Sequence, residues 1–350
     1  MAGNSFGKIF RITAFGESHG MGVGVIVDGC PPRINLLPQD FERDMARRKP
    51  GAYHLGTPRK EADQVEVLSG VFEGLTTGAP ITLFIRNRDV QSQPYEVLRS
   101  LSRPGHADYT YFKKYGHFDF RGGGRSSARE TAARVAAGVV AAKVLEPSGV
   151  EVTAYTLELG GVRAKAFDLH AIDKNACYCP DPAAAKQMEL ALSRAKEDGD
   201  SLGGVIEVRV KGCPPGLGEP VFDKLDGDLA KAVMSVGAVK GVEIGAGFEA
   251  ARLKGSENND PITPHGFGSN RAGGILGGIS NGDEIVIKAA VKPVPSIKKE
   301  QDTVDRQGQP AKLKLGGRHD ISAVPRIVPV LEAMVRIVVA DHYLRAKTIG

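Results

Sequence analysis

The chain has 350 residues, of which 41% are hydrophobic and 25% charged, the proportions of an ordinary globular protein. Its 46 basic and 41 acidic residues leave a formal charge of +5, a mild excess that favours small acidic ligands. The chain has no tryptophan and only 6% aromatic residues, so we do not expect it to bind nucleic acid. No stretch reaches the ~18 apolar residues of a membrane span and no signal-peptide core is visible, so we expect a cytoplasmic protein without a membrane partner. The length indicates one large domain or two closely packed halves, and we expect a single domain over residues 1–350.

The N-terminal region is predicted to form strands and one short helix. Alternating apolar residues indicate strands over 7–15, 22–28, 65–72 and 80–86. The helix begins at Pro38 and ends at Pro50.

A serine motif lies between the first two predicted strands. Residues 16–20, GESHG, match the nucleophile pattern G-x-S-x-G of hydrolases. In those hydrolases the nucleophilic serine lies in a turn between a strand and a helix. Here another strand follows the motif, so a serine hydrolase is a minor alternative. His19 is a candidate proton donor because imidazole titrates near neutrality.

Residues 103–145 combine cationic side chains with the start of a helix. Ser127 and Glu130 fit the capping box S-x-x-E, so a helix should begin near Ser127, and its apolar circumference predicts burial. Three glycines at 122–124 and free helix-start N–H groups favour an anion. Arg125 and Arg129, four residues apart, are expected to lean toward that anion. Alternatively, this is a structural helix whose arginines meet surface carboxylates.

The remaining chain alternates between groups of strands and long helices. Strands are predicted over 150–159, 203–211, 242–253 and 284–291, helices over 182–197, 224–236 and 327–345, and long loops over 255–282 and 298–317. His319 and Asp320, beside Arg318, are candidates for proton transfer. Consecutive strand pairs without regular strand–helix–strand alternation predict an α+β fold, with antiparallel sheets packed on helices.

The four cysteines do not have the spacing of a metal site. A C-x-C pair with two distant partners lacks the paired spacing of a zinc site, so no metal is predicted. We expect ordinary reduced thiols at Cys30, Cys177, Cys179 and Cys213.

Six motifs together resemble those of the chorismate synthases. They are GESHG at 16–20, RPGHADYTY at 103–111, RGGGRSSARETAARVAAG at 121–138, GAVKGVEIGAGF at 237–248, SNRAGGILGGISNGDEI at 269–285 and GRHD at 317–320. The resemblance covers nearly the whole chain in the right order. It implies a β-α-β sandwich, with antiparallel sheets on a central layer of helices, and a homotetramer. It also implies the last step of the shikimate pathway, 1,4-anti elimination of phosphate from 5-enolpyruvylshikimate 3-phosphate to give chorismate, with reduced FMN and no net redox change.

The resemblance also implies roles for individual residues. His19 corresponds to the acid that protonates departing phosphate, His106 to the histidine beside reduced flavin, and Asp320 to the acid that assists proton removal. The positions that match the substrate site are Arg48, Arg103, Ser127, Arg129 and Arg318. Those that match the flavin site are Arg125, Ser126, Ser127, Gly237, Ala238, Gly277, Lys292, Pro293, Val294, Pro295, Ser296 and Arg318.

Two positions depart from the family pattern. His54 stands where many members carry a second arginine after Arg48, a pair associated with NADPH binding, and Gly237 stands where many carry asparagine. No nicotinamide fingerprint is present, so either NADPH or an external flavin reductase remains open as the source of electrons. A non-catalytic anion-binding or RNA-binding protein is the alternative from another functional class.

Overall fold

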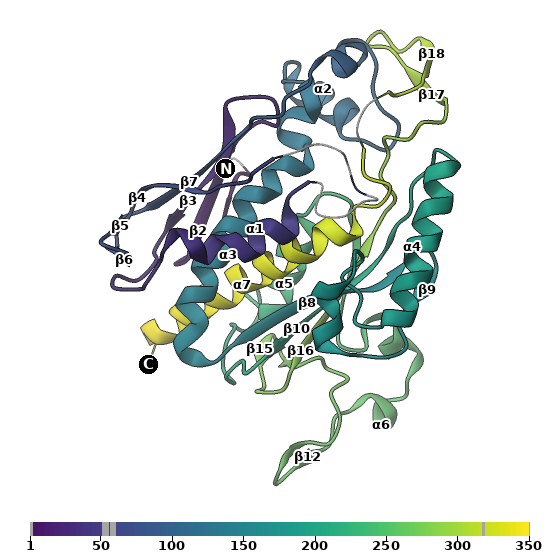
Figure 1. The fold of residues 1–350 in the computed structure, drawn as a ribbon. Coiled ribbons are helices and arrows are strands. Elements are labelled where there is room, and N and C mark those ends of the chain that lie inside the picture. The colour runs from purple at the N-terminus through teal and green to yellow at the C-terminus, as the bar shows by residue number, and fades with distance from the viewer. Residues whose placement is uncertain (1–2, 51–55, 57–60, 317–318, 350) are drawn as a thin grey trace.

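The computed structural model describes residues 3–50, 56, 61–316 and 319–349, and its two main sheets enclose a layer of helices (Figure 1). This is the predicted α+β architecture with antiparallel sheets. In the described part of the chain, no helix combines the length and apolar character that crossing a bilayer requires.

The first sheet is formed by N-terminal strands. Its order is β1 (Ser5–Phe6), β2 (Arg11–Gly16), β3 (Gly22–Asp28), β7 (Ile81–Arg86) and β4 (Glu66–Ser69), all antiparallel. Ile81, Leu83 and Ile85 are fully buried, as expected for alternate residues of a strand with one face on the core. A small hairpin, β5 (Val71–Phe72) with β6 (Leu75–Thr76), separates β4 from β7.

The second sheet is formed by later strands. Its order is β11 (Val239–Ile244), β16 (Ile285–Val291), β10 (Gly204–Lys211), β8 (Glu151–Leu159) and β9 (Val162–Arg163), again antiparallel. Ile206, Val208 and Val210 alternate along the central strand β10 and are fully buried. The inner faces of both sheets therefore contribute to one core.

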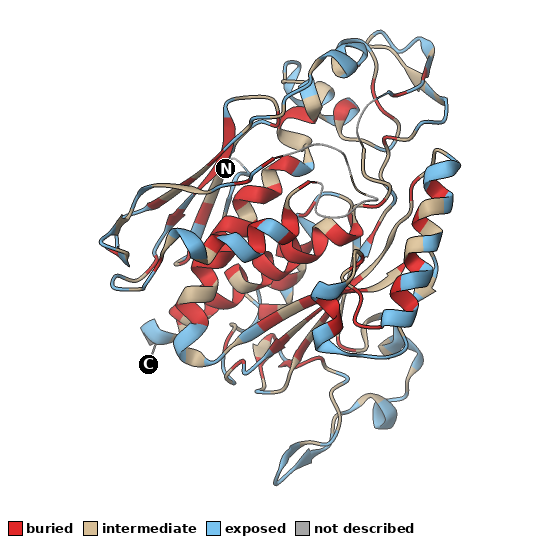
Figure 2. Ribbon diagram, viewed as in Figure 1, coloured by how far each residue is buried: buried red, intermediate tan, exposed pale blue. Residues whose placement is uncertain are grey.

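The central layer contains α1 (Glu42–Arg48), α3 (Thr131–Leu145), α5 (Leu225–Met234) and α7 (Val324–Ile349). α3 packs on β3 and β7, α7 packs on β8 and β10, and the two helices pack on each other. Figure 2 shows this layer as the most buried part of the molecule. At the crossing, a Cβ on Gly138 would lie 2.4 Å from the Cβ of Ala333, so glycine permits the close approach of α3 and α7.

The peripheral elements are mostly short. The helices are α2 (Asp108–Tyr115), α4 (Pro182–Glu197) and α6 (Gly255–Asn258), and the 3-10 turns are η1 (Pro38–Phe41), η2 (Gln93–Arg99), η3 (Arg121–Ser126), η4 (Ala128–Glu130), η5 (Glu146–Ser148), η6 (Leu169–Lys174) and η7 (Gly247–Arg252). The hairpins pair β12 (Ile262–Thr263) with β13 (Gly266–Phe267), β14 (Ile275–Leu276) with β15 (Ile279–Ser280), and β17 (Gln301–Val304) with β18 (Pro310–Leu313).

Some predicted boundaries were wrong. The strand predicted over 242–253 ends at Ile244, because Gly245 and Gly247 take left-handed conformations and the chain turns into η7. The predicted loops 255–282 and 298–317 contain the short hairpins just described. Helix α4 is amphipathic, with Met188 and Leu192 buried.

The four cysteines are free and buried, and burial raises the pKa of Cys30, Cys177 and Cys213 to about 11, 12 and 11.

Candidate active site

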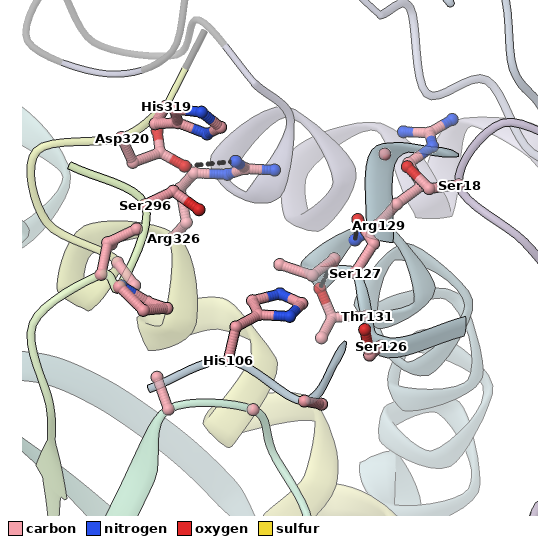
Figure 3. Close-up of a pocket in the computed structure, with 18 of the residues that line it drawn as sticks. Ser18, His106, Ser126, Ser127, Arg129, Thr131, Ser296, His319, Asp320 and Arg326 are labelled. Atoms are coloured by element: carbon pink, nitrogen blue, oxygen red, sulfur yellow. Dashed lines mark hydrogen bonds and ion pairs between the residues drawn. The ribbon is translucent and has the colours of Figure 1, made fainter. Parts of the chain in front are cut away.

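A cavity of about 360 Å³ lies where the start of α3 faces the start of α7 (Figure 3). Its wall is built mainly from five segments that are distant in sequence. These segments lie within 103–107, 126–131, 236–238, 292–296 and 319–327. The central helices therefore place the conspicuous motifs of the sequence around one space.

The three-glycine loop forms part of this wall and cannot carry side chains. Gly122, Gly123 and Gly124 all have positive φ, at 56°, 81° and 53°, a region that favours glycine. A Cβ on Gly122 would lie 2.3 Å from Nε2 of His19, and one on Gly124 would lie 2.1 Å from a backbone oxygen. The loop thus lets the chain pass tightly between His19 and the cavity.

The helix predicted to begin near Ser127 does begin there. Ser127 is extended and its Oγ accepts a hydrogen bond from the Arg129 N–H at 3.3 Å, after which η4 leads directly into α3. Glu130 pairs instead with Arg134 at 2.8 Å. Ser127, Ala128 and Thr131 line the cavity, so the positive end of the α3 dipole lies beside it.

The expectation that Arg125 and Arg129 lean toward one anion is wrong. The guanidinium of Arg125 donates to the carbonyl oxygens of Ala14, at 2.9 Å, and Gly16, at 3.4 Å. Arg129 donates to Asn87 at 2.9 Å and lines the cavity. The two side chains diverge because Ser127 is extended, so no continuous helix joins them.

A buried carboxylate stands behind Arg129. Asp63, only 3% exposed, pairs with the Arg129 guanidinium and accepts from Arg48 Nη1 at 3.1 Å. Arg48 also donates to Thr131 Oγ1 at 3.2 Å and to the Ala128 carbonyl at 2.6 Å. Burial alone would raise the pKa of the Asp63 carboxyl, but Arg48 and Arg129 outweigh it and lower that pKa. The carboxylate is therefore ionised and holds both guanidinium groups against the start of α3.

A second buried carboxylate, Asp108, stands behind His106 and Arg103. Its Oδ1 lies 2.8 Å from His106 Nδ1, and its two oxygens accept from Arg103 Nε at 2.7 Å and Nη2 at 2.8 Å. Burial lowers the pKa of His106, and Arg103 and Lys292 lower it further, against the opposing effect of Asp108. His106 is therefore neutral near pH 7, with its Nδ1–H directed at the carboxylate.

Comparison with known proteins identifies the family of this chain. A family model described as chorismate synthase matches residues 10–344. The chain is 61% identical over 344 residues to the chorismate synthase of Syntrophobacter fumaroxidans, covering 98% of each chain, and 59% identical over 351 residues to that of Desulfosudis oleivorans, covering 100% and 99%. The chain belongs to the chorismate synthase family. A crystal structure of chorismate synthase has a TM-score of 0.77 to this fold at 33% identity, covering 99% of this chain and 94% of that one.

Most positions that match the chorismate synthase pattern lie around the cavity. The expected residues that line it are Arg103, His106, Ser126, Ser127, Arg129, Gly237, Ala238, Lys292, Val294, Pro295, Ser296 and Asp320. Asp320 accepts from Arg326 Nη1 at 2.6 Å (Figure 3), Lys292 donates to the Gly105 carbonyl, and Ser296 accepts from Arg103 Nη1 at 3.3 Å.

Other expected positions stand outside the wall. Those that do not line the cavity are His19, Arg48, Arg125, Gly277 and Pro293. His19 bonds to Ser92 at 2.9 Å and packs edge-on against Tyr95, which itself lines the cavity. His54 and Arg318 lie outside the described residues.

Several residues of the site carried no clear signal in the sequence. Asp63 is one of several acids in a polar stretch, Asp108 opens a short helix, and Arg326 is one of several cations in α7. Their partners in the folded chain reveal them: Arg129 for Asp63, Arg103 and His106 for Asp108, and Asp320 for Arg326. Among the described residues, no cluster of three or more His, Cys, Asp or Glu side chains has the arrangement of a metal site.

Proposed function

We propose that this protein is a chorismate synthase, which converts 5-enolpyruvylshikimate 3-phosphate to chorismate and phosphate by a 1,4-anti elimination that requires reduced FMN. Membership of the family and the 61% identity to a chorismate synthase support the activity. The arrangement of charge around the cavity supports the substrate.

The observation that carries the proposal is that two arginines face the cavity while the carboxylates that bind them stand behind them. Arg103, Arg129 and Lys292 line the cavity, whereas Asp63 and Asp108, which hold the two arginines, do not. Guanidinium groups fixed in this way present their remaining N–H donors to a ligand. A substrate with a phosphate and two carboxylates matches such a wall.

Other residues of the wall fit a flavin. Val236, Ala238, Val294 and Pro295 offer apolar and backbone surface, while Ser126, Lys292 and Ser296 supply hydrogen-bond donors. A Cβ on Gly237 would meet no atom within 4 Å, so this departure from the family pattern leaves extra room at the same wall. Reduced FMN, when bound, would supply electron density transiently to assist phosphate departure and recover it afterwards.

The titratable side chains have distinct proposed tasks. His106, whose Nδ1–H is directed at Asp108, exchanges a proton with the flavin environment through Nε2. Asp320, held by Arg326, is the carboxylate that assists removal of the substrate proton. His19 stands behind Tyr95 and Gly122, so protonation of the departing phosphate by His19 requires that part of the wall to shift.

The homotetramer is part of the same proposal. Phe15, Ile26 and Phe84 lie on the outer face of the first sheet, where Phe15 stacks on Phe84 at 6.4 Å between ring centroids. Apolar side chains grouped on an exposed sheet face favour contact with another subunit. Light scattering coupled to size-exclusion chromatography measures the assembly, and a monomeric mass would contradict it.

The activity is tested by anaerobic incubation with reduced FMN and 5-enolpyruvylshikimate 3-phosphate. We expect release of phosphate and appearance of chorismate. Folded protein that releases no phosphate, and that instead binds RNA in a salt-dependent manner without binding flavin, would refute the proposal. Replacing the chemical reductant by NADPH alone distinguishes an enzyme that reduces its own flavin from one that needs an external reductase.

A further inference from the structure

His319 lies in the cavity wall with one ring nitrogen unused. Its Nε2 is buried and, in the described part of the chain, has no hydrogen-bond partner. The ring packs edge-on against Tyr95, with 6.5 Å between centroids and an interplanar angle of 89°. Figure 3 shows His319 beside Asp320, at the side of the cavity across from Ser127.

The second ring nitrogen has a partner that fixes the tautomer. The backbone of Gly316 hydrogen-bonds the ring and favours its protonated form, as a carbonyl acceptor does. Since Nε2 has no partner, Nδ1 is the nitrogen that donates to this carbonyl. The neutral ring therefore carries its proton on Nδ1 and leaves a lone pair on Nε2.

The surroundings keep the ring neutral near pH 7. Burial lowers the pKa of His319, and the nearby Arg103 and His106 lower it further, against the opposing effects of Gly316 and Asp320. Arg103 does not supply the missing donor, because its Nε and Nη2 donate to Asp108 and its Nη1 donates to Ser296. Water or a bound molecule is then the remaining source of a hydrogen bond to Nε2, and a ligand that fills the cavity displaces the water.

We propose that Nε2 of His319 accepts a hydrogen bond from a neutral donor of the bound ligand, a hydroxyl or an imide N–H, and so helps to determine which molecule the cavity accepts. The inference rests on the proposed function, in which the substrate ring carries a hydroxyl and the flavin ring carries an imide. A neutral acceptor repels phosphate and carboxylate oxygens, so His319 complements the arginines by recognising an uncharged part of the ligand.

The test compares two substitutions that differ in the acceptor. His319→Leu removes the acceptor, whereas His319→Gln offers an amide oxygen in its place. Dissociation constants are measured without turnover, for oxidised FMN by fluorescence quenching and for 5-enolpyruvylshikimate 3-phosphate by calorimetry. We expect His319→Leu to weaken the binding of one ligand by about 3- to 10-fold, the contribution of one neutral hydrogen bond. His319→Gln should restore most of the lost affinity. His265→Leu, at an exposed position in the β12–β13 connection, is the matched control and should bind as the wild type does.

The ligand that loses affinity identifies the donor. Weaker FMN binding points to the imide, and an FMN methylated at that nitrogen should then be insensitive to His319→Leu. Weaker substrate binding points to the hydroxyl. Unchanged affinity for both ligands in His319→Leu, or equal losses in the Leu and Gln variants, would overturn the inference while leaving the proposed function intact. Wild-type protein that binds neither ligand would overturn both.

A measurement on the unmodified protein guards against variants that fold poorly. Nitrogen-15 NMR of labelled histidine should show His319 protonated on Nδ1 and unprotonated on Nε2 at pH 7.5. Addition of the recognised ligand should shift the Nε2 resonance in the direction of hydrogen-bond acceptance. A ring protonated on Nε2, or an Nε2 resonance that no ligand moves, would contradict the assignment.

Discussion

Asp108 Oδ1 lies 2.8 Å from His106 Nδ1, and the same buried carboxylate binds the Arg103 guanidinium through both of its oxygens. One side chain thus fixes the tautomer of a histidine and the direction of an arginine, both of which line the cavity. Asp108 itself does not line the cavity, so it acts as a positioning residue for the two groups that do.

Asp108→Asn should impair turnover and move its pH dependence. The asparagine amide does not fix the tautomer of His106 and does not neutralise the charge of Arg103. We therefore expect kcat to fall by about 10- to 100-fold, a smaller loss than the ~10²–10⁴-fold expected for His106→Ala. Because Asp108 raises the pKa of His106, its removal should shift the acidic limb of the kcat profile to lower pH.

The control for this prediction is His117→Ala, which removes an exposed histidine. It should leave kcat and its pH profile unchanged. Asp108→Glu should restore part of the activity because it retains the carboxylate. A lowered kcat with an unmoved pH profile in Asp108→Asn would show that Asp108 does not act through His106.

Asp63→Asn should strongly destabilise the protein. The substitution leaves Arg48 and Arg129 buried without their shared counter-ion, and breaking such a pair costs about 3–5 kcal/mol in the free energy of unfolding. Asp63 has φ of 51°, a conformation that asparagine tolerates well, so the effect isolates the charge. Urea denaturation at pH 7 measures the change.

The matched control is Glu66→Gln, which breaks the exposed pair with Arg86. Exposed pairs contribute less than about 1 kcal/mol, so this variant should unfold near the wild-type midpoint. Equal stability losses in Asp63→Asn and Glu66→Gln would contradict the importance of the buried cluster.

Much of the fold could be predicted because its signals are local. The alternation in β7 and β10, the cap at Ser127 and the apolar circumference of α3 depend on neighbouring residues, and all appear in the structure. The end of β11 was misplaced because a positive φ at Gly245 and Gly247 turns the chain, and at Gly245 a Cβ would lie 2.2 Å from the Arg271 carbonyl oxygen, a contact distant in sequence. The short hairpins were missed because their strands bury few side chains, so the sequence shows no periodic apolar pattern there.

The site was predictable where motifs carry it and not where tertiary contacts do. His106, Arg103 and Arg129 belong to recognisable motifs and line the cavity. Asp63 meets Arg129 across 66 positions of the chain, a pairing that no local pattern encodes. The expected convergence of Arg125 on Arg129 failed for a different reason, since it assumed a continuous helix where the chain is extended at Ser127.

Gly138→Ala should destabilise the crossing of α3 and α7. The new Cβ would lie 2.4 Å from the Cβ and 2.6 Å from the Cα of Ala333, so the helices must move apart. We expect a net loss of about 1–2 kcal/mol, because overpacking outweighs the gain in helix propensity. Gly227→Ala, at an exposed position in α5 where a Cβ would meet only the Lys224 Cβ at 3.6 Å, should instead be neutral or slightly stabilising. Denaturation curves for the two variants that coincide would contradict a tight crossing.

Stability without ligands should rise as the pH increases from about 5 to 7. The pKa values of His106, His319 and His342 are all lowered in the folded protein, mainly by burial. The pKa of histidine in the unfolded chain is ~6.5. Below that pH the unfolded chain therefore binds more protons than the folded protein, which favours unfolding, and above that pH this proton uptake no longer destabilises the fold. The lowered pKa values of Asp63 and Asp108 act at lower pH, as the unfolded carboxyl pKa is ~3.9. Urea denaturation of the flavin-free protein across this range checks the prediction, and His342→Gln should reduce the slope. Stability that is flat or falls between pH 5 and 7 would show that these imidazoles are not held neutral by the fold.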